Sequence, residues 1–295
     1  MVLAVFAKPK SKKLTWQQGD IEGVWVGRAS HAGPTVGLLG GVHGDERAGV
    51  EIVKAAHNHL KIDRGTVIVM MGNLPAIERG IRYIDTNLNR SFKTLDSSNN
   101  VKKLQYEAYR AQQLLPYLDK CESILDLHEY NDLKDKPFII CERDTLEIAL
   151  RIGAPVISFG WSKTEAGGSD GYMHSQGKEG LVYELGPRTH TSQDVHLGVK
   201  VLLRFLAAKG MIDDKLPTLF RNPMLVQTHK AIKRADKHYK LTRHFTTFEK
   251  LVPGELIAVN GKDRIYAKPE QVIIFAEPNP PIGDEAFSIG RIVNN

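Results

Sequence analysis

Cysteine and long apolar runs are scarce in this chain of 295 residues. The only two cysteines, Cys121 and Cys141, are too few for a disulfide framework or a thiolate metal cluster, which favours a reducing compartment. No apolar run approaches the ~20 residues that a membrane-spanning helix needs. Residues 1–7 lack the charged start and long apolar core of a signal peptide. The sequence therefore predicts a cytoplasmic protein without a membrane partner.

Charge and aromatic content are equally modest. The formal net charge is +6 and aromatic residues make up 7% of the chain. Lysine and arginine gather over residues 228–243, but Tyr239 and Phe245 are the only aromatic residues near enough to stack on bases. We therefore expect no nucleic-acid partner. The positive charge fits an anionic substrate, although a solvated basic surface explains it equally well.

The most informative stretch, residues 40–49, is a glycine-rich turn. Residues 35–39 before it predict a buried strand, and the apolar spacing after it predicts a helix over residues 48–59. His43 and Glu46 lie in this turn, at the sheet edge where open α/β proteins bind ligands. Imidazole and carboxylate groups are ligands that zinc takes. The pair predicts two zinc ligands, although an isolated H-x-x-E turn is also compatible with solvated side chains.

A third ligand is expected at the end of another strand. Residues 123–130 predict an apolar strand that carries His128, with Asp126 on the same side of the strand. Two histidines and one carboxylate with an open fourth position are typical of hydrolytic zinc sites. The sequence thus predicts one Zn²⁺ per chain held by three ligands, with Asp126 orienting one of them. These predicted ligands are His43, Glu46 and His128.

Two further polar features fit a hydrolytic site. Arg82, Asn89 and Arg90 offer donors that suit a carboxylate, and an arginine beside a polarised carbonyl can stabilise an oxyanion. Residues 180–187 predict an apolar strand containing Glu184, whose burial would raise its pKa toward that of a general base. The alternative for Arg82 and Arg90 is that they are ordinary surface arginines. The alternative for Glu184 is a buried structural ion pair.

The chain is expected to divide after residue 214. Residues 213–217 are typical of a linker, and the segment beyond them combines short strand patterns with proline and glycine turns. We therefore predict an α/β domain over 1–214 and a small β-rich domain over 215–295. Within the first, the small residues of 166–172 predict a loop. Further strands are predicted at 21–26, 66–71, 137–140 and 155–159, and further helices at 101–118, 145–152 and 195–208.

The motifs, in this order, resemble the succinylglutamate desuccinylase/aspartoacylase family, relatives of zinc carboxypeptidases. They are the H-x-x-E turn, Asn87 to Phe92 (N-x-N-R-x-F), Asp126-Leu127-His128, and Tyr183-Glu184-Leu185-Gly186. The similarity covers roughly residues 35 to 190. It implies an α/β fold with a carboxypeptidase-like mixed sheet flanked by helices, and a smaller C-terminal β-domain.

The resemblance also implies zinc-dependent hydrolysis of the amide bond of a small anionic N-acyl amino acid. Glu184 would take a proton from the zinc-bound water and pass it to the leaving amine. Arg82 would meet the oxyanion, while Asn89 and Arg90 would hold a substrate carboxylate. N-succinylglutamate is the first candidate, because His174 stands where an aspartoacylase would carry an arginine. Aspartoacylase-type deacetylation, carboxypeptidase activity on a short peptide and a non-catalytic binding module remain alternatives.

Overall fold

The computed structural model is a mixed α/β protein, and it describes residues 14–94, 104–130, 136–162, 164, 166–188, 192–213, 216 and 219–293. Its strands are β1 (Thr15–Gln18), β2 (Val24–Arg28), β3 (Thr35–Gly40), β4 (Thr66–Met71), β5 (Ser123–Tyr130), β6 (Phe138–Cys141), β7 (Val156–Phe159), β8 (Glu179–Pro187), β9 (Met224–Lys233), β10 (Lys240–Leu241), β11 (Glu249–Lys250), β12 (Leu256–Asn260), β13 (Asp263–Tyr266), β14 (Gln271–Ile274) and β15 (Glu285–Val293). Its helices are α1 (Arg47–His59), α2 (Leu74–Arg79), α3 (Tyr106–Leu118), α4 (Leu146–Ile152), α5 (Ser169–Ser175) and α6 (Ser192–Ala208), with short 3-10 turns η2 (Leu88–Arg90) and η4 (Arg143–Thr145).

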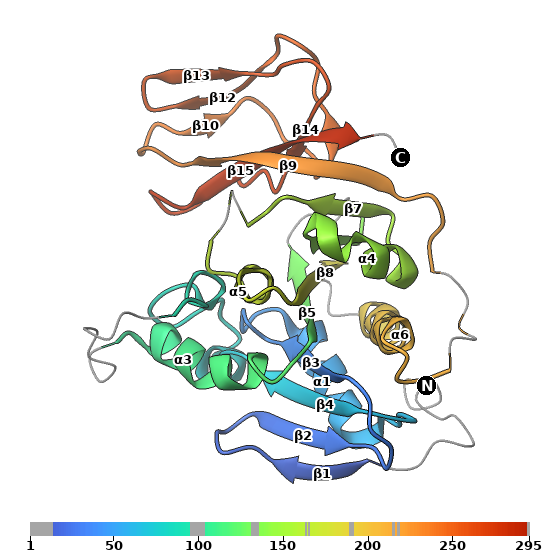
Figure 1. The fold of residues 1–295 in the computed structure, drawn as a ribbon. Helices are drawn as coiled ribbons and strands as arrows, with labels where there is room; N and C mark the ends of the chain where they lie inside the picture. Colours follow the sequence, from blue (N-terminus) through green and yellow to red (C-terminus); the bar gives the residue numbers. More distant parts are fainter. Residues whose placement is uncertain are drawn as a thin grey trace.

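One large sheet organises the molecule (Figure 1). It has 12 strands in the order β1-β2-β4-β3-β5-β8-β6-β7-β9-β15-β14-β11. Its centre, β4-β3-β5-β8, is parallel, whereas β2 and β6 join this centre in the antiparallel sense. Parallel strands are buried on both faces and read as continuous apolar runs, as Thr66–Met71 does. The carboxyl ends of β3, β5 and β8 therefore meet at one edge.

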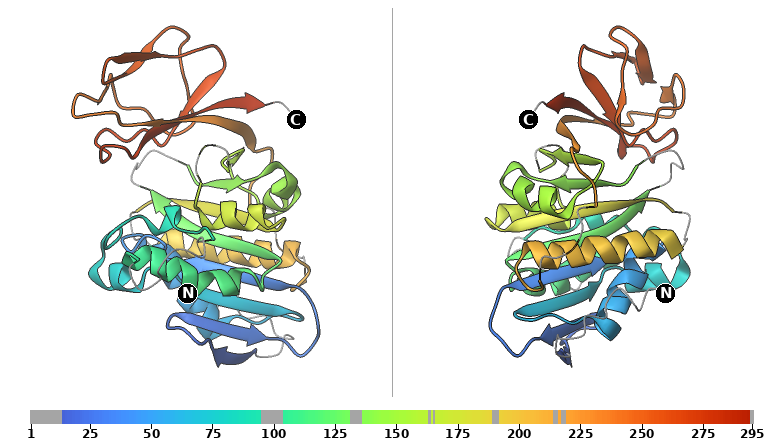
Figure 2. Two further views of the ribbon diagram at one scale, coloured as in Figure 1. Left: turned by 60° about the vertical axis from the view of Figure 1, so that its left-hand side comes forward. Right: turned by 90° about the vertical axis from the view of Figure 1, so that its right-hand side faces the viewer.

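Helices cover both faces of this sheet. The core on one face contains apolar residues of α1, α4 and α6, and the core on the other contains residues of α3 and α5. After a quarter turn of the molecule, α6 is seen lying lengthwise across its face (Figure 2). Alternate residues of β5 and β8 thus point toward different helices, which decides the side on which each polar group of these strands acts.

The C-terminal strands lie at one end of the molecule in both views of Figure 2. β9 pairs in parallel with β7, so the large sheet continues across the predicted division at residue 214. Beyond β9, the strands β15, β14 and β11 complete the large sheet, and β10, β12 and β13 form a second sheet of three strands. These C-terminal strands share an apolar cluster of their own that includes Phe245, Ile257 and Phe287. The division into domains 1–214 and 215–295 stays a prediction.

The expected fold class is confirmed, because the described chain is a large mixed sheet with helices and a C-terminal β region. The predicted strands and helices recur with shifts of a few residues at their ends; residues 101–103 of the predicted 101–118 helix lie outside the described part. The loop predicted over 166–172 is wrong in its second half, because α5 begins at Ser169.

Two smaller observations bear on the setting of the chain. No helix in the described ranges is both long enough and apolar enough to cross a membrane. Cys121 and Cys141 are free and buried. Burial raises the pKa of each thiol to about 12, so both are held in the protonated, unreactive form at neutral pH.

Candidate metal centre

The predicted zinc ligands meet at the carboxyl edge of β3 and β5. His43 and Glu46 lie in the turn between β3 and α1, and His128 lies near the end of β5. Gly49 in the first turn of α1 makes this proximity possible, because a Cβ atom there would lie 2.5 Å from the carbonyl oxygen of Leu127. Only a residue without a side chain lets α1 come this close to β5.

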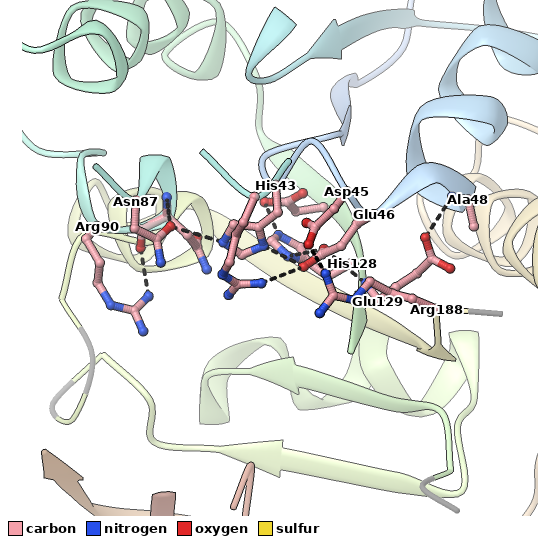
Figure 3. A network of polar contacts seen from close by, with 12 residues as sticks. His43, Asp45, Glu46, Ala48, Asn87, Arg90, His128, Glu129 and Arg188 are labelled. Atoms are coloured by element: carbon pink, nitrogen blue, oxygen red, sulfur yellow. Dashed lines mark hydrogen bonds and ion pairs between the residues drawn. The ribbon is translucent and has the colours of Figure 1, made fainter. Parts of the chain in front are cut away.

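The three side chains converge on one point (Figure 3). A ligand atom from each of His43, Glu46 and His128 lies within 4.8 Å of the others, and all three residues are buried. His43 Nδ1 lies 2.7 Å from Glu46 Oε1, and His128 Nδ1 lies 3.1 Å from Glu46 Oε2. The carboxylate therefore faces the same nitrogen of both imidazole rings.

The opposite nitrogen of each ring is held by a second polar group. His43 Nε2 lies 3.0 Å from Asn87 Oδ1, and His128 Nε2 lies 3.1 Å from Asp126 Oδ2. Ser169 Oγ donates to the same oxygen of Asp126 at 2.6 Å. Such contacts fix the orientation and the tautomer of a metal-ligating histidine. They leave both Nδ1 atoms directed at Glu46.

The carboxylates of the group attract positive charge, whether a proton or a metal ion supplies it. Burial lowers the pKa of His43 to about 4, so its ring is neutral, and in the tautomer that donates from Nε2 to Asn87 Oδ1 the Nδ1 atom carries a lone pair. A lone pair aimed at a carboxylate is repulsive unless a positive ion lies between them. Burial also acts to lower the pKa of His128, but the carboxylates of Asp126 and Glu46 outweigh it and raise that pKa well above its usual range. The donor set of two imidazole nitrogens and a carboxylate is one that zinc takes.

Glu184 lies beside this group on β8. It is paired in register with His128 of β5, so the two side chains emerge on the same face of the sheet. Glu184 is buried, and its Oε2 atom has no hydrogen-bond partner within the described part of the chain. Burial raises its pKa to about 8, against the opposing effect of His128. Its carboxyl group can therefore both accept and release a proton near neutral pH.

The predicted substrate-binding residues divide into two groups. Arg82 Nη1 lies 3.2 Å from Glu46 Oε1, and its side chain is 45% exposed, so its guanidinium reaches both the ligands and solvent. Arg90 Nη1 donates to the main-chain oxygen of Asn89, and Arg90 Nη2 lies 3.5 Å from Glu285 Oε2 of β15. Figure 3 shows Arg90 at the opposite end of the network from Glu129, with His43 and Glu46 between them. The structure thus brings Arg82 next to the predicted metal ligands and sets Arg90 against the C-terminal strands.

Asn89 follows Asn87 in η2, and its Oδ1 atom is buried without a hydrogen-bond partner among the described residues. His174 lies on α5, where its Nδ1 atom is 3.3 Å from Asp144 Oδ2. His174 therefore lies next to η4.

Several residues of the network are not evident from the sequence. Asn87 and Ser169 support the two histidines, as described above, and Glu129 follows His128 directly. The N–H of Glu129 donates to Glu46 Oε2 at 3.1 Å, while its side chain accepts the N–H of Ala48 at 2.8 Å. Burial raises the pKa of Glu129 to about 7. The position of Glu129 after a ligand histidine was the only sequence feature that could have pointed to it.

Asp45 and Arg188 form an ion pair at the other side of the turn. Asp45 lies between the predicted ligands His43 and Glu46, and Arg188 directly follows the last residue of β8. The pair therefore ties the turn of these predicted ligands to the strand that carries Glu184. Sequence separation of more than one hundred residues hides such a pair from any local pattern.

The catalytic-domain model of the succinylglutamate desuccinylase/aspartoacylase family matches residues 32–208. A probable aspartoacylase of Prochlorococcus marinus (strain MIT 9313) is 29% identical over 170 residues, which cover 53% of this chain and 54% of that protein. An N-acyl-aromatic-L-amino acid amidohydrolase (carboxylate-forming) of Xenopus tropicalis is 31% identical over 121 residues, covering 38% of this chain and 39% of that protein. The chain thus spans about half, or less, of the length of these curated relatives.

Solved structures share the whole fold. Succinylglutamate desuccinylase of Vibrio cholerae superimposes with a TM-score of 0.78 at 17% identity, covering 99% of this chain and 94% of that one. The product-bound ectoine utilization protein EutE of Ruegeria pomeroyi superimposes with a TM-score of 0.67 at 17% identity, covering 96% and 99%. At such identities the likeness establishes the fold alone, whereas the matched family model covers more than half of the sequence. By that match, the chain belongs to the succinylglutamate desuccinylase/aspartoacylase family.

Proposed function

We propose that this protein is a zinc-dependent amidohydrolase that cleaves the amide bond of an N-acyl amino acid. The observation that carries the proposal is the convergence of three buried donors beside a buried carboxyl oxygen of Glu184 that has no hydrogen-bond partner among the described residues. Three ionisable groups in one buried site are costly to fold unless a cation or a proton compensates them. A structural role alone gives no reason to set a fourth ionisable group, the carboxyl group of Glu184, beside them.

In this proposal His43, Glu46 and His128 hold one zinc ion. When bound, zinc supplies a Lewis acid that polarises the acyl carbonyl and acidifies a water molecule. Asn87 and Asp126 keep the two rings oriented through their Nε2 atoms. The Glu129 N–H, which donates to Glu46 Oε2, holds the carboxylate ligand in place.

Glu184 then serves as the proton carrier. It accepts a proton as the water oxygen bonds to the acyl carbon, and it delivers that proton to the nitrogen as the C–N bond breaks. The products are a carboxylic acid and an amino acid. Its pKa of about 8 suits both halves of this transfer, because neither protonation state is strongly disfavoured near neutral pH.

Arg82 is proposed to stabilise the negative charge that develops on the acyl oxygen. Its guanidinium already lies 3.2 Å from Glu46 Oε1, so it borders the place where that charge forms. Asn89 and Arg90 are proposed to bind a carboxylate of the substrate, because a guanidinium and an amide present donors of matching geometry. Binding at Arg90 competes with Glu285, which lies 3.5 Å away.

The proposed substrate is a small anionic N-acyl amino acid. N-succinylglutamate is the first to test, and N-acyl aromatic and N-acetyl amino acids follow because curated relatives are named for related substrates. The presence of two free cysteines is consistent with our proposal that the enzyme works in a reducing cytoplasm.

Metal content and activity together test the proposal. The purified chain is expected to hold about one zinc ion, measured by elemental analysis, and to lose it in His128→Ala but keep it in His174→Ala. The zinc-loaded chain should release amine from at least one N-acyl amino acid. Failure to retain zinc after supplementation would overturn the metal site, and cleavage of dipeptides in preference to every acyl amino acid would overturn the substrate class.

A further inference from the structure

The carboxylate of Glu107 is fully buried at 0% exposure in the first turn of α3, and its partners are N–H groups. Oε1 accepts from the side-chain amide of Asn73 at 2.9 Å and from the N–H of Ile84 at 2.6 Å. Oε2 accepts from the N–H groups of Asp85 and Thr86, each at 3.1 Å. Three consecutive backbone N–H groups thus point at one anion, a concave arrangement that binds negative charge strongly.

The segment held in this way, residues 82–87, borders the metal site at three points. The carbonyl of Arg82 accepts the N–H of Gly44 at 3.2 Å, and its guanidinium contacts Glu46. At the other end, Asn87 Oδ1 lies 3.0 Å from His43 Nε2. Between these contacts the backbone has no regular secondary structure, so its shape depends on the hydrogen bonds that it makes.

We infer that Glu107 is a positioning residue, which holds the 82–87 segment against the metal-binding turn and so sets the places of Arg82 and Asn87. The effect of Glu107 on the metal site rests on the proposed function, whereas its hold on the 82–87 segment does not. Glu107 contacts none of the three proposed ligands. It binds the main chain of residues 84–86, which lie between Arg82 and Asn87, and these two residues contact the proposed ligands.

A matched control is available three residues further along the same helix. Arg110 is also buried, and it too binds main-chain groups of distant segments, the carbonyl oxygens of Gly72, Met71 and Glu22. None of these contacts involves residues 82–87. Arg110→Gln should therefore weaken the fold to a similar degree without releasing the segment.

The experiment uses the full chain loaded with zinc and two readouts. In Glu107→Gln one acceptor oxygen is replaced by an amide that faces N–H donors, so amide hydrogen exchange at Ile84, Asp85 and Thr86 should rise at least tenfold. Zinc release to a chelator should quicken about 10- to 100-fold, the range for lost support of a metal ligand. Arg110→Gln should lower the melting temperature while leaving both readouts close to wild type.

A double variant tests the route of the effect. If Glu107 acts through Asn87, the fold-increase in the rate of zinc release in the double variant, Glu107→Gln with Asn87→Ala, should be smaller than the product of the fold-increases in the two single variants. Unchanged exchange at residues 84–86, or a fully multiplicative double variant, would overturn the inference. A wild-type chain that binds no zinc would overturn the proposed function, and the exchange measurement would still decide whether Glu107 holds the segment.

Discussion

His128 and Glu184 occupy the same register position on the neighbouring parallel strands β5 and β8. A proposed metal ligand and a proposed proton carrier are thereby fixed side by side by main-chain hydrogen bonds, which hold residues more firmly than a loop does. Because Glu184 has no hydrogen-bond partner for Oε2 in the described part of the chain, its substitution should cost the structure little. A substitution of Glu184 should therefore remove the proton transfer while the metal stays bound.

Glu184→Gln should lower kcat about 10²- to 10⁴-fold, the usual range for loss of a general acid or base. Zinc content should stay at the wild-type level, because Glu184 is outside the proposed ligand set. Steady-state kinetics and elemental analysis of the same preparation check both parts. Glu179→Gln, at the start of the same strand, serves as the control, and near wild-type turnover in Glu184→Gln would exclude the proposed role.

Asp126→Asn should weaken zinc binding about 10- to 100-fold, as expected when a metal-ligating histidine loses a carboxylate partner. The amide cannot supply the negative charge that now faces His128 Nε2 at 3.1 Å. Chelator competition at fixed pH measures the affinity. Ser169→Ala, which removes only the hydrogen bond to Asp126, should have a smaller effect, and equal affinities in wild type and Asp126→Asn would contradict this role.

Glu285→Gln should lower KM for an anionic substrate by up to about fivefold, which corresponds to the upper end of the free energy measured for surface ion pairs. The change removes the carboxylate that lies 3.5 Å from Arg90 Nη2 and so removes one competitor of the substrate for the guanidinium. Ser288→Ala, which removes a hydrogen bond to Glu285 but keeps its charge, is the matched control. Initial-rate kinetics should show that Arg90→Gln has the opposite effect; KM values unchanged in both variants would rule out carboxylate binding there.

Acid should destabilise the protein through His57. Its ring is stacked on Trp25 and meets Trp16 edge-on, and burial lowers its pKa. A histidine with a lowered folded pKa contributes stability that is present above the unfolded value, ~6.5, and is lost as pH falls. The drop in melting temperature from pH 7.5 to 5.5 should therefore be smaller in His57→Gln than in the wild type, and unaltered in the control His59→Gln. An equal drop in all three proteins would contradict the assignment.

Two helical glycines should respond oppositely to alanine. Gly49→Ala places a Cβ atom 2.5 Å from Leu127 O, so α1 must move away from β5, at a cost of about 1–3 kcal/mol typical of overpacking. Gly171 in α5 has open space around its Cα, and Gly171→Ala should gain about 0.5–1 kcal/mol of helix propensity. Denaturant unfolding measures both. A neutral Gly49→Ala would show that the contact between α1 and β5 can relax.

Much of the fold and the three donor positions could be predicted from the sequence. Thr66–Met71 is a strand with the predicted bounds, because a buried parallel strand needs an unbroken apolar run. His43 and His128 each follow such a run, and parallel neighbours bring their carboxyl ends to one edge. Sequence pattern is sufficient where one periodic element determines the position of a side chain.

Prediction was weaker where burial or pairing comes from distant segments. The sequence pattern indicates only a basic stretch from residue 228, because exposed Lys230 and Lys233 mask the buried Leu225, Val226 and Ile232 of β9. Asn87 reaches His43 from a segment shaped by Glu107, and nothing in the local spacing of that segment encodes its path. The sequence predicts a loop at Ser169, because the glycines before it hide the start of a seven-residue helix.

The continuation of the large sheet from β7 into β9 limits how the molecule can move. The two strands are hydrogen-bonded over Val156–Phe159 and Met224–Gln227. Swinging the C-terminal strands away as a rigid lid would break this ladder and leave two unpaired strand edges in water. β15, which carries Glu285, pairs with β9 and is held by the same ladder, so a change in the distance between Arg90 and Glu285 must come from side chains or from the turn that carries Arg90.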